Sequence, residues 1–312
     1  MKILEQLFSV KNNNEKTHKI ITILGIKIKL NRKRKVNKNA KLNNFGIKTQ
    51  NKEVVILGNG PSLKDTLADS NFWEFIKNKD VFCVNSFPTS EYYLKIKPKY
   101  LVFMDPAFWC KNLLASRVEG MTKIAENIKN ATWEMRIFMP TFAKEWNWFK
   151  EAEKENDNIK ISYLCTQDYF GNDDIERFSM YKENSAMPSP QNVLIACIYC
   201  AINIGYKKIY IFGADHTWHL ALVVRDDNLV CIQDKHFYDG KEEVKLTPMY
   251  KNPEGKDPFT MKEIMRNYMI DYEKYEILEE YSKYIGSKIY NMSKISYIDA
   301  FERKKLEEVF QN

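Results

Sequence analysis

Short apolar runs alternate with longer helical patterns along most of this chain. The first clear run, Val54 to Leu57, is rich in β-branched residues, as in a parallel strand that is buried on both faces. Similar runs follow at 81–84, 100–103, 137–139, 159–163, 209–212 and 288–290. Helical patterns lie between them at 73–77, 107–128, 142–154, 192–204 and 261–285. This alternation predicts an α/β fold, a Rossmann-like parallel sheet with crossover helices.

A glycine-rich turn, Gly-Asn-Gly-Pro-Ser, follows the first strand. Its glycines permit a tight turn, and Pro61 suits the first position of a helix. A helix that begins here would direct N–H groups and the positive end of its dipole toward a bound phosphate. We therefore predict an anion site at Gly58, Asn59, Gly60 and Ser62, with a purely structural turn as the alternative.

Polar side chains also follow the later strands. Ligands of parallel sheets gather at the carboxyl ends of the strands, so residues at these ends are candidates for a site. The candidates are Asn85, Asp105, Asp215, His216 and Ser293. Each of them alone also suits a turn or a helix cap. Their occurrence after successive strands favours one shared site.

The basic charge of the chain is concentrated at its N-terminal end. Residues 1–50 contain 13 Lys or Arg and two Glu, a net charge of +11, whereas the whole chain is +7 and residues 51–312 are therefore −4. No apolar run approaches the ~20 residues that span a bilayer, and no signal-peptide pattern is evident. We expect residues 1–50 to be a basic arm on an anionic membrane surface, where each Lys or Arg contributes about 1 kcal/mol. The alternative is a solvated arm, and the scarcity of aromatic residues argues against nucleic acid.

The six cysteines show no spacing typical of a disulfide framework. Cys197 and Cys200 lie within an apolar helical pattern, so we interpret them as core residues rather than as a metal or redox pair.

Taken together, these motifs resemble bacterial glycosyltransferase family 42, the sialyltransferases of lipooligosaccharide synthesis. The resemblance covers about residues 53–303. It is carried by the glycine turn and by residues 83–87, 105–106, 201–215 and 288–293. Related motifs occur in the motility-accessory-factor proteins, which resemble nonulosonic acid transferases.

The resemblance implies an inverting transfer of sialic acid or another keto-acid sugar from a CMP-activated donor to a surface glycan such as lipooligosaccharide or capsule. Together with the basic arm, this leads us to expect a cytoplasmic enzyme, peripheral at the inner face of the plasma membrane. It places the phosphate at the glycine turn, the nucleotide at Asn85, and the ribose and base near Asp215 and Ser293. Asp105 replaces an asparagine of the family, and Gln191 and Asn192 stand where the family binds the sugar carboxylate. At a helix N-terminus they can still bind an acidic or neutral group.

The acceptor hydroxyl needs a general base, and imidazole suits this role near neutral pH. His236 lies at 217–257, a region with little regular pattern where the family has a lid with its catalytic histidine. We therefore expect a lid-like region and His236 as the base, with His216 as the alternative. The chain has no Asp-x-Asp motif, so we expect a reaction without metal or cofactor. A metal site of Asp215, His216, His219 and His236 is a further alternative. Another nucleotide sugar, or nucleotide binding without turnover, also remains open.

Overall fold

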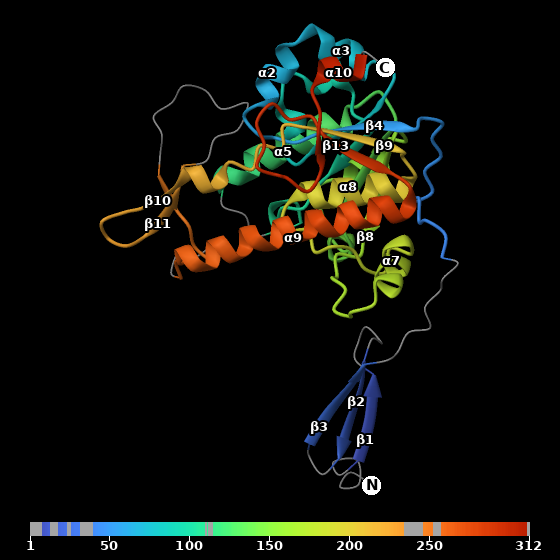
Figure 1. The fold of residues 1–312 in the computed structure, drawn as a ribbon, viewed down its shortest axis with the longest axis vertical. Coiled ribbons are helices and arrows are strands. Elements are labelled where there is room, and N and C mark those ends of the chain that lie inside the picture. The colour runs from blue at the N-terminus through green and yellow to red at the C-terminus, as the bar shows by residue number, and fades with distance from the viewer. Residues whose placement is uncertain are drawn as a thin grey trace. The chain divides into compact units, whose positions relative to one another are not determined.

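The computed structural model describes residues 8–12, 18–23, 26–31, 40–109, 111, 115–233, 246–251 and 257–310. The chain forms two compact units, Met1–Asn39 and Ala40–Asn312. In the first unit, β1 (Phe8–Asn12), β2 (His18–Ile23) and β3 (Ile26–Asn31) pair antiparallel in chain order (Figure 1).

The second unit is built on an eight-stranded sheet in which every neighbouring pair is parallel. The order across the sheet is β14-β13-β9-β4-β5-β6-β7-β8. The strands are β4 (Glu53–Leu57), β5 (Asp80–Val84), β6 (Tyr100–Val102), β7 (Met135–Pro140), β8 (Ile159–Leu164), β9 (Lys208–Phe212), β13 (Lys288–Asn291) and β14 (Glu302–Arg303). The chain runs outward from β4 to β8 and then returns to place β9 on the other side of β4. The predicted α/β fold with a parallel sheet is confirmed.

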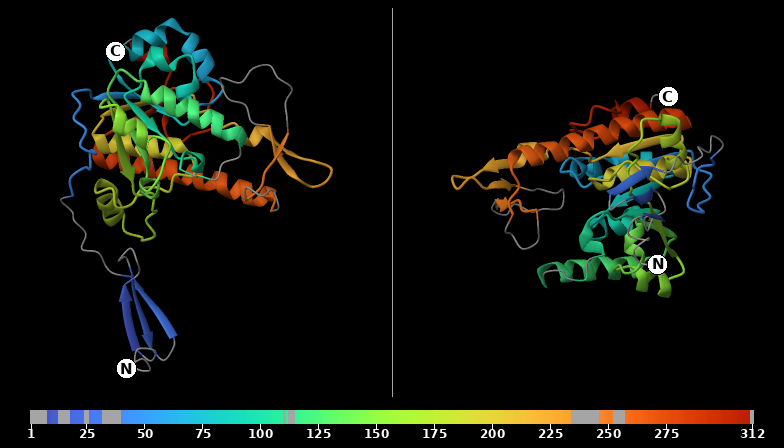
Figure 2. Two further views of the ribbon diagram at one scale, coloured as in Figure 1. Left: turned by 180° about the vertical axis from the view of Figure 1, so that it is seen from behind. Right: turned by 90° about the horizontal axis from the view of Figure 1, so that it is seen from below.

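The two faces of the sheet are covered by different helices, which explains the continuous apolar runs. In β4, Val54 and Ile56 pack with α8 (Val193–Ile204) and α9 (Met261–Ile285). Val55 and Leu57 pack on the opposite face with residues of α2 (Leu63–Ala68), α3 (Ser70–Ile76), α5 (Ala115–Lys129) and α6 (Lys150–Glu155). Seen from below, α9 and α5 lie on opposite sides of the sheet (Figure 2). In β4, β5 and β9 every position after the first is buried and apolar, because helices cover both faces of the sheet.

The helices match the sequence patterns where no turn residue interrupts them. α8 and α9 have the predicted bounds to within one residue, and Cys197 and Cys200 are confirmed as fully buried core residues of α8. The helix expected at 142–154 is instead η3 (Thr141–Lys144) followed by α6. Asn147 separates them, because its side chain donates to the Ala143 carbonyl and accepts the Phe149 N–H.

Two further expectations need correction. The region 217–257 has more regular structure than its sequence pattern indicated: η4 (Trp218–Ala221) leads into an antiparallel sheet of β10 (Leu222–Val224), β11 (Val230–Ile232) and β12 (Thr247–Pro248). Residues 234–245 and 252–256 lie outside the described part. Residues 40–50, grouped above with the basic arm, belong to the second unit: Ile47 is buried in its core, and the Asn43 N–H donates to the Lys182 carbonyl. The remaining elements are η1 (Phe87–Thr89), α4 (Tyr93–Ile96), η2 (Pro106–Phe108), α7 (Asp174–Lys182) and α10 (Leu306–Phe310).

Candidate functional site

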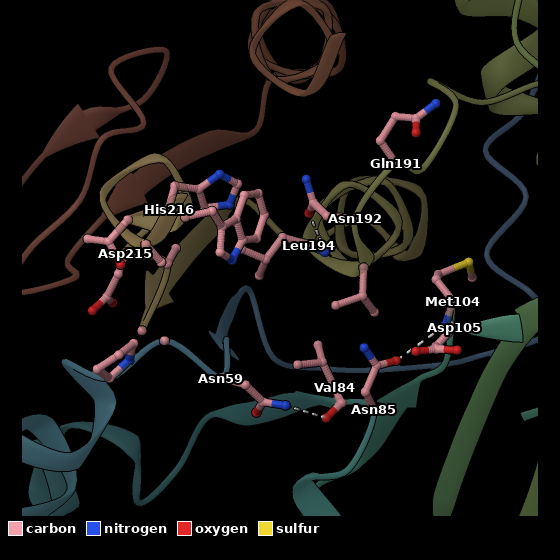
Figure 3. Close-up of a pocket in the computed structure, with 18 of the residues that line it drawn as sticks. Asn59, Val84, Asn85, Met104, Asp105, Gln191, Asn192, Leu194, Asp215 and His216 are labelled. Atoms are coloured by element: carbon pink, nitrogen blue, oxygen red, sulfur yellow. Dashed lines mark hydrogen bonds between the residues drawn. The ribbon is translucent and has the colours of Figure 1, made fainter. Parts of the chain in front are cut away.

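A cavity of about 590 Å³ lies at the carboxyl ends of β4, β5 and β9. This is where the strand order reverses, the usual place for a ligand in an open parallel sheet. Eight of the predicted site residues line it, as Figure 3 shows for most of them: Asn59, Gly60, Asn85, Asp105, Gln191, Asn192, Asp215 and His216. Gly58, Ser62 and Ser293 are not among the lining residues, and His236 lies outside the described part of the chain.

The glycine turn after β4 packs backbone to backbone against the turn after β9. The Gly58 N–H donates to the Phe212 carbonyl at 2.8 Å and the Gly60 N–H to the Gly213 carbonyl at 2.9 Å. A β-carbon on Gly58 would lie 2.5 Å from the Gly213 oxygen, and one on Gly60 would lie 2.6 Å from it. Glycine is therefore required here by the close approach of two turns, whatever ligand binds above them.

Asp215 fastens the same two turns together. Its carboxylate accepts the Ser62 N–H at 2.8 Å and the Ser62 hydroxyl at 2.6 Å. Burial raises the pKa of this carboxyl group, and the two hydrogen bonds from Ser62 act in the opposite direction. Ser293 stabilises the turn after β9, because its Oγ accepts the Ala214 N–H at 2.9 Å. Asp215, Ser62 and Ser293 thus hold in place the two turns that border the cavity.

These contacts correct the expected phosphate site. The N–H groups of Gly58, Gly60 and Ser62 already donate to protein oxygens, so in this structure they are not available to a phosphate. Pro61 is also not the first helical residue, because α2 begins at Leu63.

Two asparagine amides at the cavity, those of Asn59 and Asn85, differ in their access to a ligand. Asn59 Nδ2 donates to the Val84 carbonyl at 3.3 Å, which turns its buried Oδ1 away from every described hydrogen-bond donor. Asn85 has a positive φ of 45°, and its Oδ1 accepts the Met104 N–H at 3.3 Å. The Nδ2 of Asn85 therefore points into the cavity (Figure 3). The cavity floor thus offers the Asn85 donor, whereas Asn59 Oδ1 is buried beneath the cavity surface.

The other predicted residues lie at the edge of the cavity. Asp105 is exposed and caps η2 by accepting the Ala107 N–H at 2.8 Å. Gln191 is exposed one residue before the N-cap of α8. Asn192 is that N-cap, and its Oδ1 accepts the Leu194 N–H at 3.0 Å.

His216 lies in the cavity wall opposite the two asparagines and contacts helix α9. Only 5% of its surface is exposed, and its φ is +52°. Its Nε2 lies 2.9 Å from the hydroxyl oxygen of Tyr275. Burial lowers the pKa of His216 to about 3, so the imidazole is neutral at physiological pH. The neutral imidazole can accept a hydrogen bond, but its low pKa makes it a poor proton acceptor near neutral pH.

Asp271 and Tyr275 contribute to the site but were not among the site residues predicted from the sequence. Asn192 Nδ2 donates to Asp271 Oδ1 at 2.8 Å, and burial raises the pKa of Asp271 to about 6 although this hydrogen bond opposes the shift. A signal was present: the buried residues of α9 include Ile264, Asp271, Tyr275 and Leu278, so a carboxylate interrupts an apolar stripe at helical spacing. Trp218, whose ring centroid lies 4.2 Å from that of His216, gave no such signal.

The alternative metal site is not assembled in the described residues. His219 packs its ring against Tyr297 with centroids 4.4 Å apart, while Asp215 is engaged by Ser62. Within the described ranges, no three His, Cys, Asp or Glu side chains are grouped closely enough to hold one ion.

Comparison with known proteins finds similarity to a solved structure, but no match to a family model or a curated protein. No protein-family model matches the chain. No curated protein matches it either. Among solved structures, the chain is similar to the MAf glycosyltransferase from Magnetospirillum magneticum AMB-1, with 12% sequence identity and a TM-score of 0.42. The match covers 84% of this chain and 35% of that protein, so this chain spans about a third of its length.

Proposed function

We propose that residues 40–312 form a glycosyltransferase that binds a nucleotide-activated sugar in the cavity at the β4/β9 switch point. The observation that carries the proposal is the amide of Asn85 on the cavity floor. Its Oδ1 is held by the Met104 N–H, and its Nδ2 faces the open space. An amide N–H in this position can donate a hydrogen bond to an oxygen or ring nitrogen of a nucleotide. The volume of about 590 Å³ suits a ligand of nucleotide size.

For the donor we propose a CMP-activated keto-acid sugar such as sialic acid. The order of the turn motifs, which resembles family 42, supports this choice, as does the lack of an Asp-x-Asp motif in the sequence. In the transfer, an acceptor hydroxyl oxygen attacks the anomeric carbon and CMP leaves with the electron pair of the broken bond. His236 takes the hydroxyl proton in this proposal, because the low pKa of His216 makes it a poor base at pH 7. The acceptor is a surface glycan, and neither a metal nor a cofactor takes part.

Binding of nucleotides tests the proposal directly. A thermal-shift panel of CMP, UMP, UDP and GDP is expected to show the largest rise of Tm with CMP, about 2.7 kcal/mol of stabilisation at a hundredfold excess over Kd. Asn85→Asp keeps the acceptor for the Met104 N–H but replaces the cavity donor by a negative oxygen. We expect it to weaken CMP binding at least tenfold.

Asn71→Asp, which adds the same charge at an exposed position of α3, is the matched control and should bind CMP like the wild type. A panel in which no nucleotide raises Tm would contradict the proposal. A response to UDP or GDP alone would assign a different nucleotide sugar. CMP binding without transfer in any acceptor assay would favour a binding protein without turnover. His236→Ala should abolish transfer and retain CMP binding.

We also propose that the unit Met1–Asn39 binds an anionic membrane surface from the cytoplasmic side. Residues 1–39 contain 11 Lys or Arg and two Glu, a net charge of +9, and the register of the three strands aligns Val10, Ile21 and Ile28. Among the described helices, none combines the length and apolar character that crossing a bilayer requires. The full chain should float with vesicles that contain phosphatidylserine, and a chain that lacks residues 1–39 should not. Equal flotation of the two would contradict this role.

A further inference from the structure

A chain of hydrogen bonds runs from Asp271 to His216 behind the cavity wall. Asn192 Nδ2 donates to Asp271 Oδ1 at 2.8 Å, and the Tyr275 hydroxyl oxygen lies 3.0 Å from Asn192 Oδ1 and 2.9 Å from His216 Nε2. Asp271 and His216 are each 5% exposed and Tyr275 is fully buried. Buried polar groups are normally satisfied, so donors and acceptors must match within this chain.

The number of protons fixes the direction of each bond. Asn192 Oδ1 also accepts the Leu194 N–H. If the oxygen and nitrogen of the Asn192 amide exchanged places, two donors would face each other at this contact, so the amide orientation is fixed. Oδ1 therefore faces Tyr275, and the single hydroxyl proton of Tyr275 must go to it. The Tyr275 oxygen is then free only to accept, which requires a proton on His216 Nε2.

His216 consequently presents a lone pair on Nδ1. Burial keeps the second proton off the ring, since it lowers the pKa to about 3. His216 lines the cavity, and Nδ1 has no hydrogen-bond partner among the described residues. The ring is also held from the side by Trp218, with centroids 4.2 Å apart. The imidazole is thus fixed in position and in protonation.

We propose that Tyr275, Asn192 and Asp271 are positioning residues that hold His216 in its Nε2-protonated form, so that Nδ1 accepts a hydrogen bond from a hydroxyl group of the sugar substrate. The nature of the substrate rests on the proposed function, whereas the protonation of the ring does not. A lone pair at this point attracts a hydroxyl group and repels a carboxylate or phosphate oxygen. The hydroxyl-bearing part of the sugar therefore lies beside His216. Asn192 Oδ1 and one of the two Nδ2 protons are engaged within this chain of hydrogen bonds, so the position of the amide is fixed.

Nuclear magnetic resonance of the ¹⁵N-histidine-labelled full chain tests the protonation. Long-range ¹H–¹⁵N correlation, with His216 assigned by the signal lost in His216→Gln, should show a proton on Nε2 and none on Nδ1 from pH 6 to 8. Tyr275→Phe removes the acceptor of the Nε2 proton, so its His216 should become a mixture of the two neutral forms. A wild-type proton on Nδ1, or an unchanged His216 in Tyr275→Phe, would overturn the proposal.

Tyr281→Phe is the matched control for this measurement. Tyr281 is also a fully buried residue of α9, and its hydroxyl donates to Asn203 Oδ1 at 2.6 Å, away from His216. The variant removes a comparable buried hydrogen bond and should leave the His216 resonances as in the wild type. A change equal to that of Tyr275→Phe would show that general loosening of α9 is the cause, which overturns the assigned role.

Addition of CMP-sialic acid tests the hydroxyl contact. At saturation it should shift the Nδ1 resonance of His216, and CMP alone should not. Binding of CMP-sialic acid without a change at Nδ1 overturns the contact. If CMP does not bind at all, the proposed function fails, while the protonation of His216 in the free protein is still decided by the measurement above.

Discussion

Replacement of Gly58 by alanine should lower the free energy of unfolding by about 3 kcal/mol. The added β-carbon would lie 2.5 Å from the carbonyl oxygen of Gly213, and backbone on both sides leaves no flexible atom to move aside. The turns after β4 and β9 would have to separate, with loss of the hydrogen bond between the Gly58 N–H and Phe212. Urea denaturation followed by tryptophan fluorescence measures the change.

Gly120→Ala is the control for this substitution. Gly120 lies within α5, and a β-carbon there would meet no atom within 4 Å. It should raise stability by about 0.5–1 kcal/mol, because alanine is the better helix former. If the free energy of unfolding of Gly58→Ala instead lies within about 1 kcal/mol of the wild-type value, the two turns are not held in close contact in solution.

Asp271→Asn is expected to stabilise the protein at pH 7 by up to about 3 kcal/mol. Burial raises the pKa of Asp271 from 3.8 to about 6 in the folded state. Between pH 3.8 and about pH 6, the carboxyl group of Asp271 is ionised in the unfolded chain but protonated in the folded chain. Stability therefore falls as pH rises from about 4 to about 6 and is constant above that range. The neutral asparagine keeps an oxygen for the Asn192 amide and removes the penalty.

Denaturation at pH 4 and at pH 7 distinguishes this effect from a simple change in packing. The gain should be present at pH 7 and small at pH 4, where the carboxyl group of the wild type is protonated in the folded state. Burial is the largest cause of the raised pKa of Asp271, which lines a small cavity together with His216, His219, Tyr268 and Tyr272. Asp299→Asn, at an exposed position, should leave both stabilities unchanged. A gain of equal size at both pH values would contradict the assigned ionisation.

The candidate site shows which contacts can be predicted from a sequence and which cannot. The residues after each strand could be placed at one sheet edge because parallel strands share a direction, and Asn59, Asn85 and His216 do lie around one cavity. Their individual roles depend on partners far along the chain. Asp215 is engaged by Ser62, 153 residues away, and Asn192 by Asp271, 79 residues away. No local pattern specifies such pairs.

The sequence by itself determined the parallel α/β fold, the bounds of the helices α8 and α9, and the concentration of positive charge before residue 51. These follow from the spacing of apolar residues and from counting charges, which are local properties. The tertiary structure decided that the glycine turn packs against Gly213 instead of presenting its N–H groups, and that His216 is buried, neutral and held by Tyr275. Both outcomes arise where β9 returns to lie beside β4, because only that contact determines which polar groups are satisfied within the protein and which remain to meet a ligand.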